Sequence, residues 1–140
     1  MKQLSVFVEN RTGMLQDVAE VLSQNGINIV ALSMADTSEF GLLRILVSDP
    51  EKGCQVLQNA HFSAVLTEVI AVKLPRHVGT LEQFLKLLSD AQINVEYMYM
   101  VNTHAASMVL KASDPERALK AISQAGIQLA GEELYHLNEE

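Results

Sequence analysis

The fold is decided by a stretch of sequence that occurs twice: residues 13–28 read GMLQDVAEVLSQNGIN, and residues 79–94 read GTLEQFLKLLSDAQIN. The copies share a glycine, leucines at helical spacing and a closing Ile-Asn. Further along, after one residue drops out, the tetrapeptide SDPE at 48–51 falls on the same tetrapeptide at 113–116. Chance does not explain a match that combines core positions, a glycine, an asparagine and a capping tetrapeptide. The chain is therefore a tandem duplication of a unit of roughly 70 residues.

Each copy predicts the same elements in the same order. Alternating apolar residues at 4–8 and at 70–74 predict a first strand. The glycine is followed by the i, i+3, i+4, i+7 stripe of an amphipathic helix. These positions are Leu15, Val18, Ala19 and Leu22 in the first copy, and Leu81, Phe84, Leu85 and Leu88 in the second.

The second half of each copy predicts a hairpin, a helix and a last strand. In the first copy, strands are expected at about 27–35 and 41–47, with a turn at 36–38 between them. A second helix begins where Asp49, and Asp114 in the other copy, precedes a proline at the first helical position. The last strands are expected at about 62–67 and 127–137.

This order, β-α-β-β-α-β taken twice, is that of the ferredoxin-like fold. The predicted fold class is α+β: two ferredoxin-like units in tandem, each an antiparallel four-stranded sheet with two helices on one face. We expect domain 1 at residues 1–68 and domain 2 at 69–140. A unit of ~70 residues has a small core, so each leans on the other or on another chain. Many functions share this fold, so the loops must indicate which one applies.

Composition excludes several classes of function. The net charge of −7 over 140 residues opposes nucleic-acid binding, which needs clustered Lys and Arg. One cysteine and four scattered histidines predict no metal site. The sequence has no signal-peptide run and no stretch of ~20 apolar residues, so we expect a cytoplasmic protein without membrane contact. No catalytic or dinucleotide motif is present, which predicts a non-enzyme without a cofactor.

The loop before the first helix can receive an anion. Backbone N–H groups at a helix N-terminus carry partial positive charge, so a carboxylate or phosphate is the natural guest there. Gly13 lets the backbone approach such a guest closely. Asn10 and Asn28 each offer a donor and an acceptor, which suits the ammonium and carboxylate of an amino acid.

These residues resemble a known family. The loop Asn10-Arg11-Thr12-Gly13-Met14-Leu15, with Asn28 about fifteen residues later, looks like the ACT domain, especially that of bacterial phosphoglycerate dehydrogenase. The resemblance implies a regulatory module that binds an amino acid where two domains meet, with the loop of one facing the strand-opening Asn of the other. When the family's ligand-binding positions are matched to this sequence, the resemblance implies Asn10, Gly13 and Asn28 as the ligand-binding candidates of the first copy. The residues beside them complete the candidate site: Arg11, Thr12, Met14, Leu15, Ile27 and Ile29.

The second copy departs from this pattern. Pro75-Arg76-His77-Val78-Gly79 keeps the glycine, but Arg76 stands in place of Asn10. Thr12 and Val78 occupy the position where the family prefers proline, and Asn94 is retained. Because of these departures we expect the second loop to serve a different ligand or none, although Arg76 could also clamp a carboxylate. The candidates here are Arg76, His77, Val78, Gly79 and Asn94.

Structural explanations of these residues stay open beside the functional ones. Gly13 and Gly79 could serve only a tight turn, and Asn28 could only satisfy backbone groups at a strand start. Arg11 and Arg76 could be solvated loop charges. Cys54 is read as a small core residue of the second helix. The run 97–100 (YMYM) is expected to send its tyrosines to one face of a strand and its methionines to the other.

Rival functions share the fold. An RNA-recognition module needs aromatic residues on its third strand, but 41–47 is aliphatic with a single charge. An acylphosphatase-like enzyme needs an arginine cradle, for which Arg11 alone is thin support. We therefore expect a non-catalytic regulatory protein that binds an amino acid and signals its level to an enzyme or regulator. An oligomerisation module without a small-molecule ligand is the alternative.

The short junction between the copies predicts a homodimer. In the ferredoxin-like order the second strand is an edge, and ACT domains often pair through it. Within one chain such pairing would separate the joined strand ends by roughly 29 Å across the sheet, whereas five extended residues reach only ~17 Å. We therefore expect the units to join through one long strand, and each edge strand to pair with another chain, with ligand sites between chains.

Overall fold

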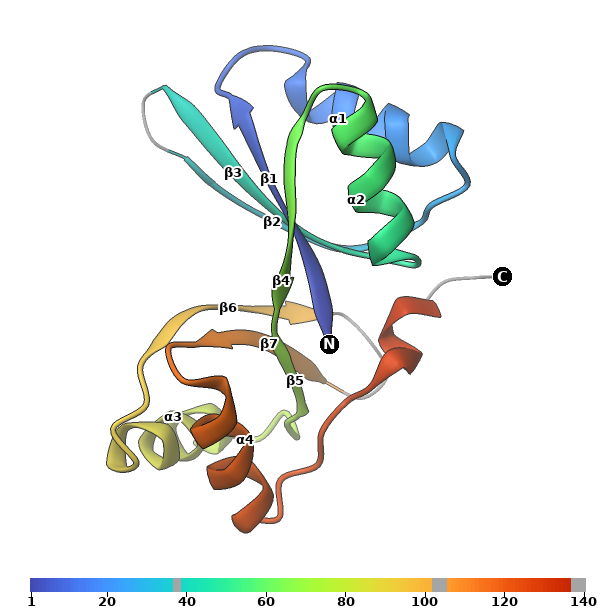
Figure 1. Cartoon of the computed structure of the whole chain (residues 1–140). Coiled ribbons are helices and arrows are strands. Elements are labelled where there is room, and N and C mark those ends of the chain that lie inside the picture. Colours follow the sequence, from blue (N-terminus) through green and yellow to red (C-terminus); the bar gives the residue numbers. More distant parts are fainter. Residues whose placement is uncertain (37–38, 102–105, 137–140) are drawn as a thin grey trace. The chain divides into compact units, whose positions relative to one another are not determined.

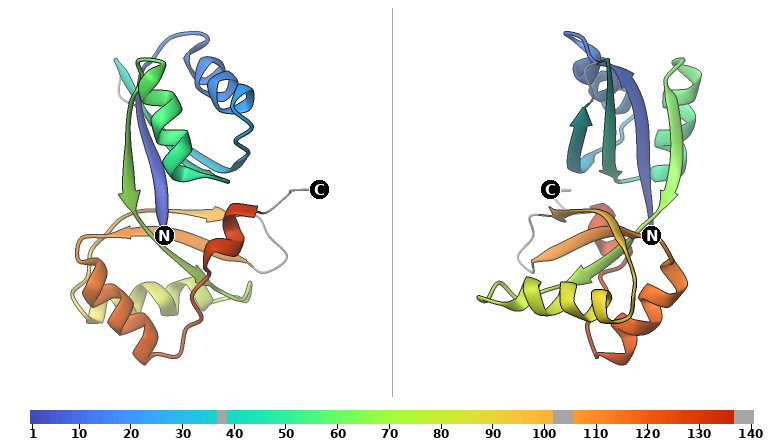
Figure 2. Two further views of the ribbon diagram at one scale, coloured as in Figure 1. Left: turned by 45° about the vertical axis from the view of Figure 1, so that its right-hand side comes forward. Right: turned by 90° about the vertical axis from the view of Figure 1, so that its left-hand side faces the viewer.

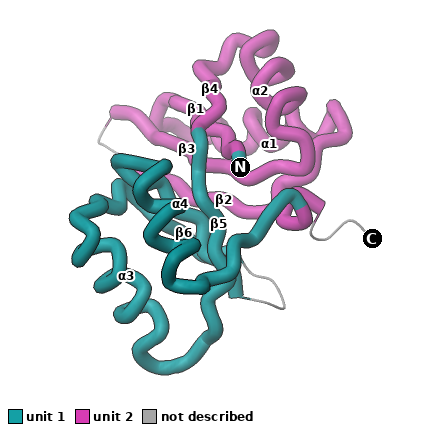
Figure 3. Tube along the Cα trace, turned by 60° about the horizontal axis from the view of Figure 1, so that its bottom comes forward, with its two compact units in different colours: residues 1, 68–132 teal, residues 2–67, 133–140 magenta. Residues whose placement is uncertain are grey.

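The computed structural model describes residues 1–36, 39–101 and 106–136 (Figure 1). The chain forms two compact units, which are coloured separately in Figure 3. The N-terminal unit (magenta) contains residues 2–67 and the segment that begins at residue 133; the C-terminal unit (teal) contains Met1 and residues 68–132. Within the described ranges, no helix is long and apolar enough to cross a membrane.

The N-terminal unit is the predicted ferredoxin-like unit. Its sheet has the order β2-β3-β1-β4, so β2 and β4 are its edges. The strands β1 and β2 both pair antiparallel with β3. The predicted hairpin turn at 36–38 lies partly outside the described residues. The elements are β1 (Lys2–Glu9), α1 (Met14–Gln24), β2 (Ile29–Asp36), β3 (Phe40–Val47), α2 (Pro50–Asn59) and β4 (Ser63–Glu68).

The core of this unit lies between its sheet and its two helices. Leu4, Val6 and Val8 alternate along β1 and are buried against Val18 and Leu22 of α1. Both helices lie on the same face of the sheet (Figure 2, left). Cys54 is buried in the same core, as its position on α2 predicted. The outer end of the predicted helical stripe differs, because Leu15 is 41% exposed.

The C-terminal unit repeats this arrangement with one strand fewer. Its sheet has three strands in the order β5-β7-β6. Phe84 and Leu88 of α3 are buried, whereas Leu81 and Leu85 of the predicted stripe are exposed. The elements are β5 (Ile70–Lys73), α3 (Thr80–Asp90), β6 (Val95–Val101), β7 (Ser107–Ala112) and α4 (Pro115–Gln124).

The prediction of a four-stranded second sheet, with a last strand at about 127–137, was wrong. Leu129 forms an isolated antiparallel bridge with Val72, and the chain then enters a 3-10 helix, η1 (Glu132–His136). Leu137, the end of the predicted strand, lies outside the described residues. Gly131 stands where β4 has Leu66, and two glutamates follow it. Glycine and glutamate are both poor strand formers, which explains why the pairing stops after a single bridge.

The backbone confirms the duplication at its special positions. Gly13 and Gly79 cap α1 and α3 with nearly identical angles, φ 90° and 89° with ψ −10° in both. The residues that follow the helices also match, because Gly26 and Gln92 both have positive φ. Asp49 accepts a hydrogen bond from the Lys52 N–H at 3.1 Å, and Asp114 accepts one from the Arg117 N–H at 3.2 Å.

The register of β6 places the tyrosines and the methionines of the run 97–100 on opposite faces of the sheet, as the sequence predicted. Tyr97 and Tyr99 lie opposite Lys111 and Val109 of β7. Met98 lies opposite Leu110 and packs against the core of the C-terminal unit. The tyrosines therefore share the sheet face that points away from this core.

Two features mark where the chain passes between the units. Only Val69 separates the end of β4 from the start of β5, so the junction has no loop, as expected. The second feature is Tyr135 of η1, which is buried in the N-terminal unit. Its hydroxyl accepts a hydrogen bond from the Lys2 N–H at 2.7 Å and donates one to the Lys2 carbonyl at 3.0 Å. The Tyr135 hydroxyl therefore pairs with both backbone groups of Lys2, the groups that a neighbouring strand would otherwise bind.

Candidate functional site

The first glycine loop connects the end of β1 to the start of α1. The Asn10 N–H donates to the Glu39 carbonyl at 3.0 Å, which ties the loop to the residue before β3. The first helical hydrogen bond runs from the Asp17 N–H to the Gly13 carbonyl at 2.9 Å. The N–H groups of Leu15 and Gln16 precede this bond, so they are donors of the first helical turn that the helix itself does not use.

The environment of Gly13 leaves room for a guest. No side chain in the described residues caps α1, and an added Cβ at Gly13 would meet nothing within 4 Å. The helices α2 and α4 differ, because an aspartate carboxylate occupies the N-terminus of each. A carboxylate from a ligand at α1 would take the place that Asp49 and Asp114 fill in the other helices.

The second loop has the same backbone but different side chains. The Gln83 N–H donates to the Gly79 carbonyl at 3.0 Å, and the Thr80 N–H donates to the His77 carbonyl at 3.2 Å. An added Cβ at Gly79 would also meet nothing within 4 Å. Val78 is fully exposed, which places an apolar side chain at the position that Thr12 holds in the first loop.

Arg11 in the first loop is not arranged as an anion cradle. Its Nε forms an ion pair with Glu9 Oε2 at 3.0 Å, and both side chains are mostly exposed. An acylphosphatase-like site would need this guanidinium directed at a phosphate, so the pairing with Glu9 weighs against that rival.

Asn28 and Asn94 occupy equivalent places before β2 and β6. The Asn28 N–H donates to Ser48 Oγ at 2.9 Å, and its carbonyl accepts from the Ser48 N–H at 2.9 Å. The Asn94 carbonyl accepts from the Ser113 N–H at the same distance. Ile27 beside Asn28 is buried, and Ile29 packs partly against the core. The backbone of Asn28 is therefore fixed by Ser48, which follows β3, and the backbone of Asn94 by Ser113, which follows β7.

The first loop and Asn28 lie at opposite ends of one sheet. Glu9, at the loop end of β1, pairs with Phe40, whereas Ile29, beside Asn28, pairs with Val47. β3 spans the 8 residues between these pairs. At about 3.4 Å per residue this separates the loop from Asn28 by roughly 24 Å. A site that uses both must take them from two different modules.

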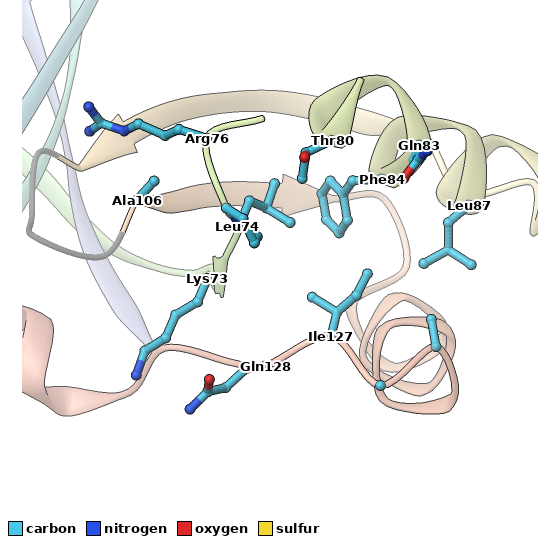
Figure 4. A pocket seen from close by; sticks show the side chains of 13 residues that line it. Lys73, Leu74, Arg76, Thr80, Gln83, Phe84, Leu87, Ala106, Ile127 and Gln128 are labelled. Carbon is cyan, nitrogen blue, oxygen red and sulfur yellow. The ribbon is translucent and has the colours of Figure 1, made fainter. Parts of the chain in front are cut away.

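The C-terminal unit contains a cavity of about 880 Å³ (Figure 4). Leu74, Phe84 and Ile127 supply apolar lining, and Thr80 supplies a hydroxyl. Among the residues of this lining, Arg76 alone belongs to the site residues predicted from the sequence. Comparison of the two copies gives no consistent signal for the rest. Thr80 and Ile127 are smaller than their counterparts Met14 and Phe62, whereas Phe84 is larger than its counterpart Val18.

We also searched the described residues for metal-binding clusters and reactive thiols. No group of three His, Cys, Asp or Glu side chains that could hold a metal occurs in the described parts of the chain. Burial raises the pKa of the Cys54 thiol. Its Sγ lies 3.6 Å from the Ala64 carbonyl oxygen. A neutral buried thiol is a packing group rather than a nucleophile.

A family model described as an ACT domain pair matches residues 1–138. The chain belongs to this family. ACT domain pairs are typical of small-molecule regulatory modules. This assignment confirms the resemblance, and with the structure it confirms the fold class of two ferredoxin-like units, apart from the fourth strand of the second sheet.

Solved structures resemble this ACT domain pair to different extents. Protein BT0572 from Bacteroides thetaiotaomicron is 36% identical, with a TM-score of 0.91 over 97% of this chain and 96% of that chain. The ligand-free regulatory subunit of aspartate kinase from Thermus thermophilus is 15% identical, with a TM-score of 0.60 over 89% and 91%. Aspartate kinase from Clostridium acetobutylicum is 13% identical, with a TM-score of 0.57 over 89% of this chain and 32% of that one. The two kinases share the fold alone. No curated protein sequence matches the chain.

Proposed function

We propose that this ACT domain pair is a non-catalytic regulatory module that binds a small amino acid and reports its level to an enzyme or regulator. The observation that carries the proposal is the start of α1, where Gly13 leaves the first-turn N–H groups beside open space. A ligand carboxylate would bind these groups, and the side chain of Asn10 would reach the ligand from the same loop.

The proposed site is shared between two copies of the chain. The loop 10–15 and Asn28 are roughly 24 Å apart along one sheet, so one unit alone cannot offer both to a small amino acid. The edge position of β2, whose first residue follows Asn28, favours pairing with a second chain. Asn28 of one copy would then face the loop of the other, with Ile27 and Ile29 beside it, in a homodimer.

The second loop is the weaker candidate for the same ligand. Gly79 and Asn94 keep the backbone features, but Arg76, His77 and Val78 replace the first loop's side chains. We therefore assign the amino acid to the first loop, and use the second as the internal comparison.

A thermal-shift screen against the twenty amino acids tests the proposal. A ligand at ~100 times its dissociation constant adds about 2.7 kcal/mol to the free energy of unfolding. At this chain length that raises the melting temperature by several degrees. Asn28→Ala should weaken binding by roughly 1.5–3 kcal/mol, because a hydrogen bond to a charged group is lost. The variant keeps the backbone bonds to Ser48, and Asn94→Ala is its matched control.

Two results would contradict this function. Absence of a shift with every amino acid would leave the oligomerisation module as the better explanation. A monomer mass by light scattering at micromolar concentration, with or without amino acid, would rule out a site built from two chains.

A further inference from the structure

We propose that Met34, on the edge strand β2, is an oxidation site, and that its conversion to methionine sulfoxide by a hydroperoxide weakens the pairing of β2 with a second chain. This inference rests on the homodimer proposed above and adds a chemical control to it. Met34 lies outside the loop 10–15 and outside the segment 27–29, so the control acts on the pairing edge rather than on a ligand contact.

The six methionines of the chain differ widely in their exposure to solvent. Met34 is 44% exposed, and Met100, its counterpart in the second copy, is 56% exposed. The other four are buried or half-buried: Met1, Met14, Met98 and Met108. Because a peroxide must reach the sulfur to oxidise it, Met34 and Met100 are the predicted targets.

Met34 lies on the part of β2 that a second chain would cover. β2 is an edge of its sheet, and Met34 pairs with Leu43, a core residue of β3. Leu32, two residues earlier on the same side of β2, pairs with the core residue Ile45 and is 46% exposed. Two large apolar side chains are therefore exposed next to each other on the helix-facing side of this edge. A second chain that pairs with β2 would remove them from water.

The end of the Met34 side chain lies over the backbone of Gly41. A Cβ added at Gly41 would be 2.7 Å from Met34 Cε and 3.2 Å from Val8 Cγ2. The missing side chain of Gly41 therefore gives Met34 its place beside the core residue Val8. A sulfoxide oxygen introduced here would lie close to apolar groups.

The reaction is a two-electron oxidation of the thioether. The Met34 sulfur attacks one oxygen of the hydroperoxide, so that an S–O bond forms and the O–O bond breaks. The displaced oxygen takes up a proton and leaves as water or an alcohol. The sulfur is oxidised and the peroxide is reduced. Methionine sulfoxide reductases reverse this change, so the modification can work as a switch.

The sulfoxide acts on the equilibrium between free and paired chains. Oxidation takes place on the dissociated chain, where the edge is open, and opposes its return to the dimer. Covering the polar oxygen costs free energy unless a new hydrogen bond replaces its contact with water. A symmetric dimer contains Met34 twice, so a penalty of roughly threefold in each chain becomes about tenfold in the dissociation constant.

The first experiment measures which methionines are oxidised. Diluted protein is treated with hydrogen peroxide, and the uptake of oxygen at each methionine is followed by mass spectrometry of its peptides. We expect Met34 and Met100 to react at least tenfold faster than the other four. In urea the six rates should become similar, which shows that the fold causes the selectivity. Similar rates in the folded chain would overturn the proposal.

The second experiment measures the dissociation constant of the dimer by analytical ultracentrifugation, before and after peroxide treatment. Oxidation of the wild type should raise this constant about tenfold, and a methionine sulfoxide reductase should restore it. Met34→Leu keeps an apolar side chain without sulfur, so its dimer should persist after treatment. Met34→Gln introduces a polar side chain of similar size and should weaken the dimer about tenfold without peroxide.

The matched controls are Met100→Leu and Met100→Gln. Met100 occupies the equivalent position on β6, an edge that the proposed dimer does not use. Met100→Gln should leave the dimer intact, and Met100→Leu should dissociate under peroxide as the wild type does.

The outcomes separate the switch from the proposed function on which it rests. A dimer that carries Met34 sulfoxide and keeps the dissociation constant of the untreated protein would overturn the switch alone. Dissociation of Met34→Leu by peroxide to the same extent as the wild type would also overturn it. A wild-type chain that is monomeric before any oxidation would contradict the proposed homodimer, and the switch with it.

Discussion

Replacing Gly13 by alanine isolates the conformational cost of the glycine at the start of α1. The added Cβ would meet nothing within 4 Å, so no steric clash contributes. The cost comes from the backbone, because φ 90° and ψ −10° lie outside the centre of the left-handed region near φ +57°, ψ +47°. A non-glycine residue in the left-handed region costs about 1–2 kcal/mol, and this far from the centre we expect the upper part, about 1.5–2 kcal/mol. The lower entropy of the unfolded alanine chain returns about 0.5 kcal/mol. We expect Gly13→Ala to lower the free energy of unfolding by about 1–1.5 kcal/mol.

Urea denaturation measures this loss, with Gly126→Ala as the matched control. Gly126 also has open space around its Cβ, but its φ is 72°, and its counterpart His61 adopts φ 71° with a side chain. The left-handed penalty there is close to its lower limit, so the expected net cost is about 0.5 kcal/mol. Equal midpoints for the two variants, at unchanged m-values, would refute the argument that the capping geometry of α1 demands glycine.

Three further changes test other parts of the structure. His61→Gly should raise the free energy of unfolding by about 0.5 kcal/mol, because it relieves the same left-handed position; a lower urea midpoint would contradict this. Tyr135→Phe removes both hydrogen bonds to Lys2 and should cost about 1–3 kcal/mol by the same measurement, whereas a wild-type midpoint would show that water replaces the hydroxyl without loss. Because burial raises the pKa of the Cys54 thiol, iodoacetamide should label the folded chain much more slowly than the urea-unfolded chain at pH 8. The raised pKa also makes stability depend on pH. The contribution of the Cys54 thiol to the free energy of unfolding is complete below the ordinary thiol pKa and declines as the pH rises past that pKa.

Most of the fold was predictable because each copy of the unit supports the interpretation of the other. Asp49-Pro50 and Asp114-Pro115 indicated the same helix start twice, and both aspartates do cap their helices. The last strand of the second copy was not predictable in this way. Its residues 127–137 were assigned by analogy with β4, although Gly131 replaces Leu66 and removes a packing side chain. Analogy between copies fails where one copy has lost the residues that stabilise the element.

The candidate site was only partly accessible from sequence. The glycine loops and asparagines could be located, because glycine at positive φ and asparagine at a strand start have local causes. Their separation at opposite ends of one sheet follows from strand register, which is a property of the folded backbone. The cavity depends on how much volume several distant side chains fill together. Comparison of the copies does not reveal that volume, because Thr80 is smaller than its counterpart Met14 whereas Phe84 is larger than its counterpart Val18.

The bonds between Tyr135 and Lys2 also constrain how the protein is made. A ribosome synthesises Lys2 at the start of β1, and Tyr135 only after both sheets have been translated. The N-terminal unit can therefore form its β-sheet early, but its buried Leu134 and Tyr135 arrive last. During synthesis the start of β1 is left without the hydroxyl that binds its first residue, so the first strand of the two units to be translated is among the last parts to be completed.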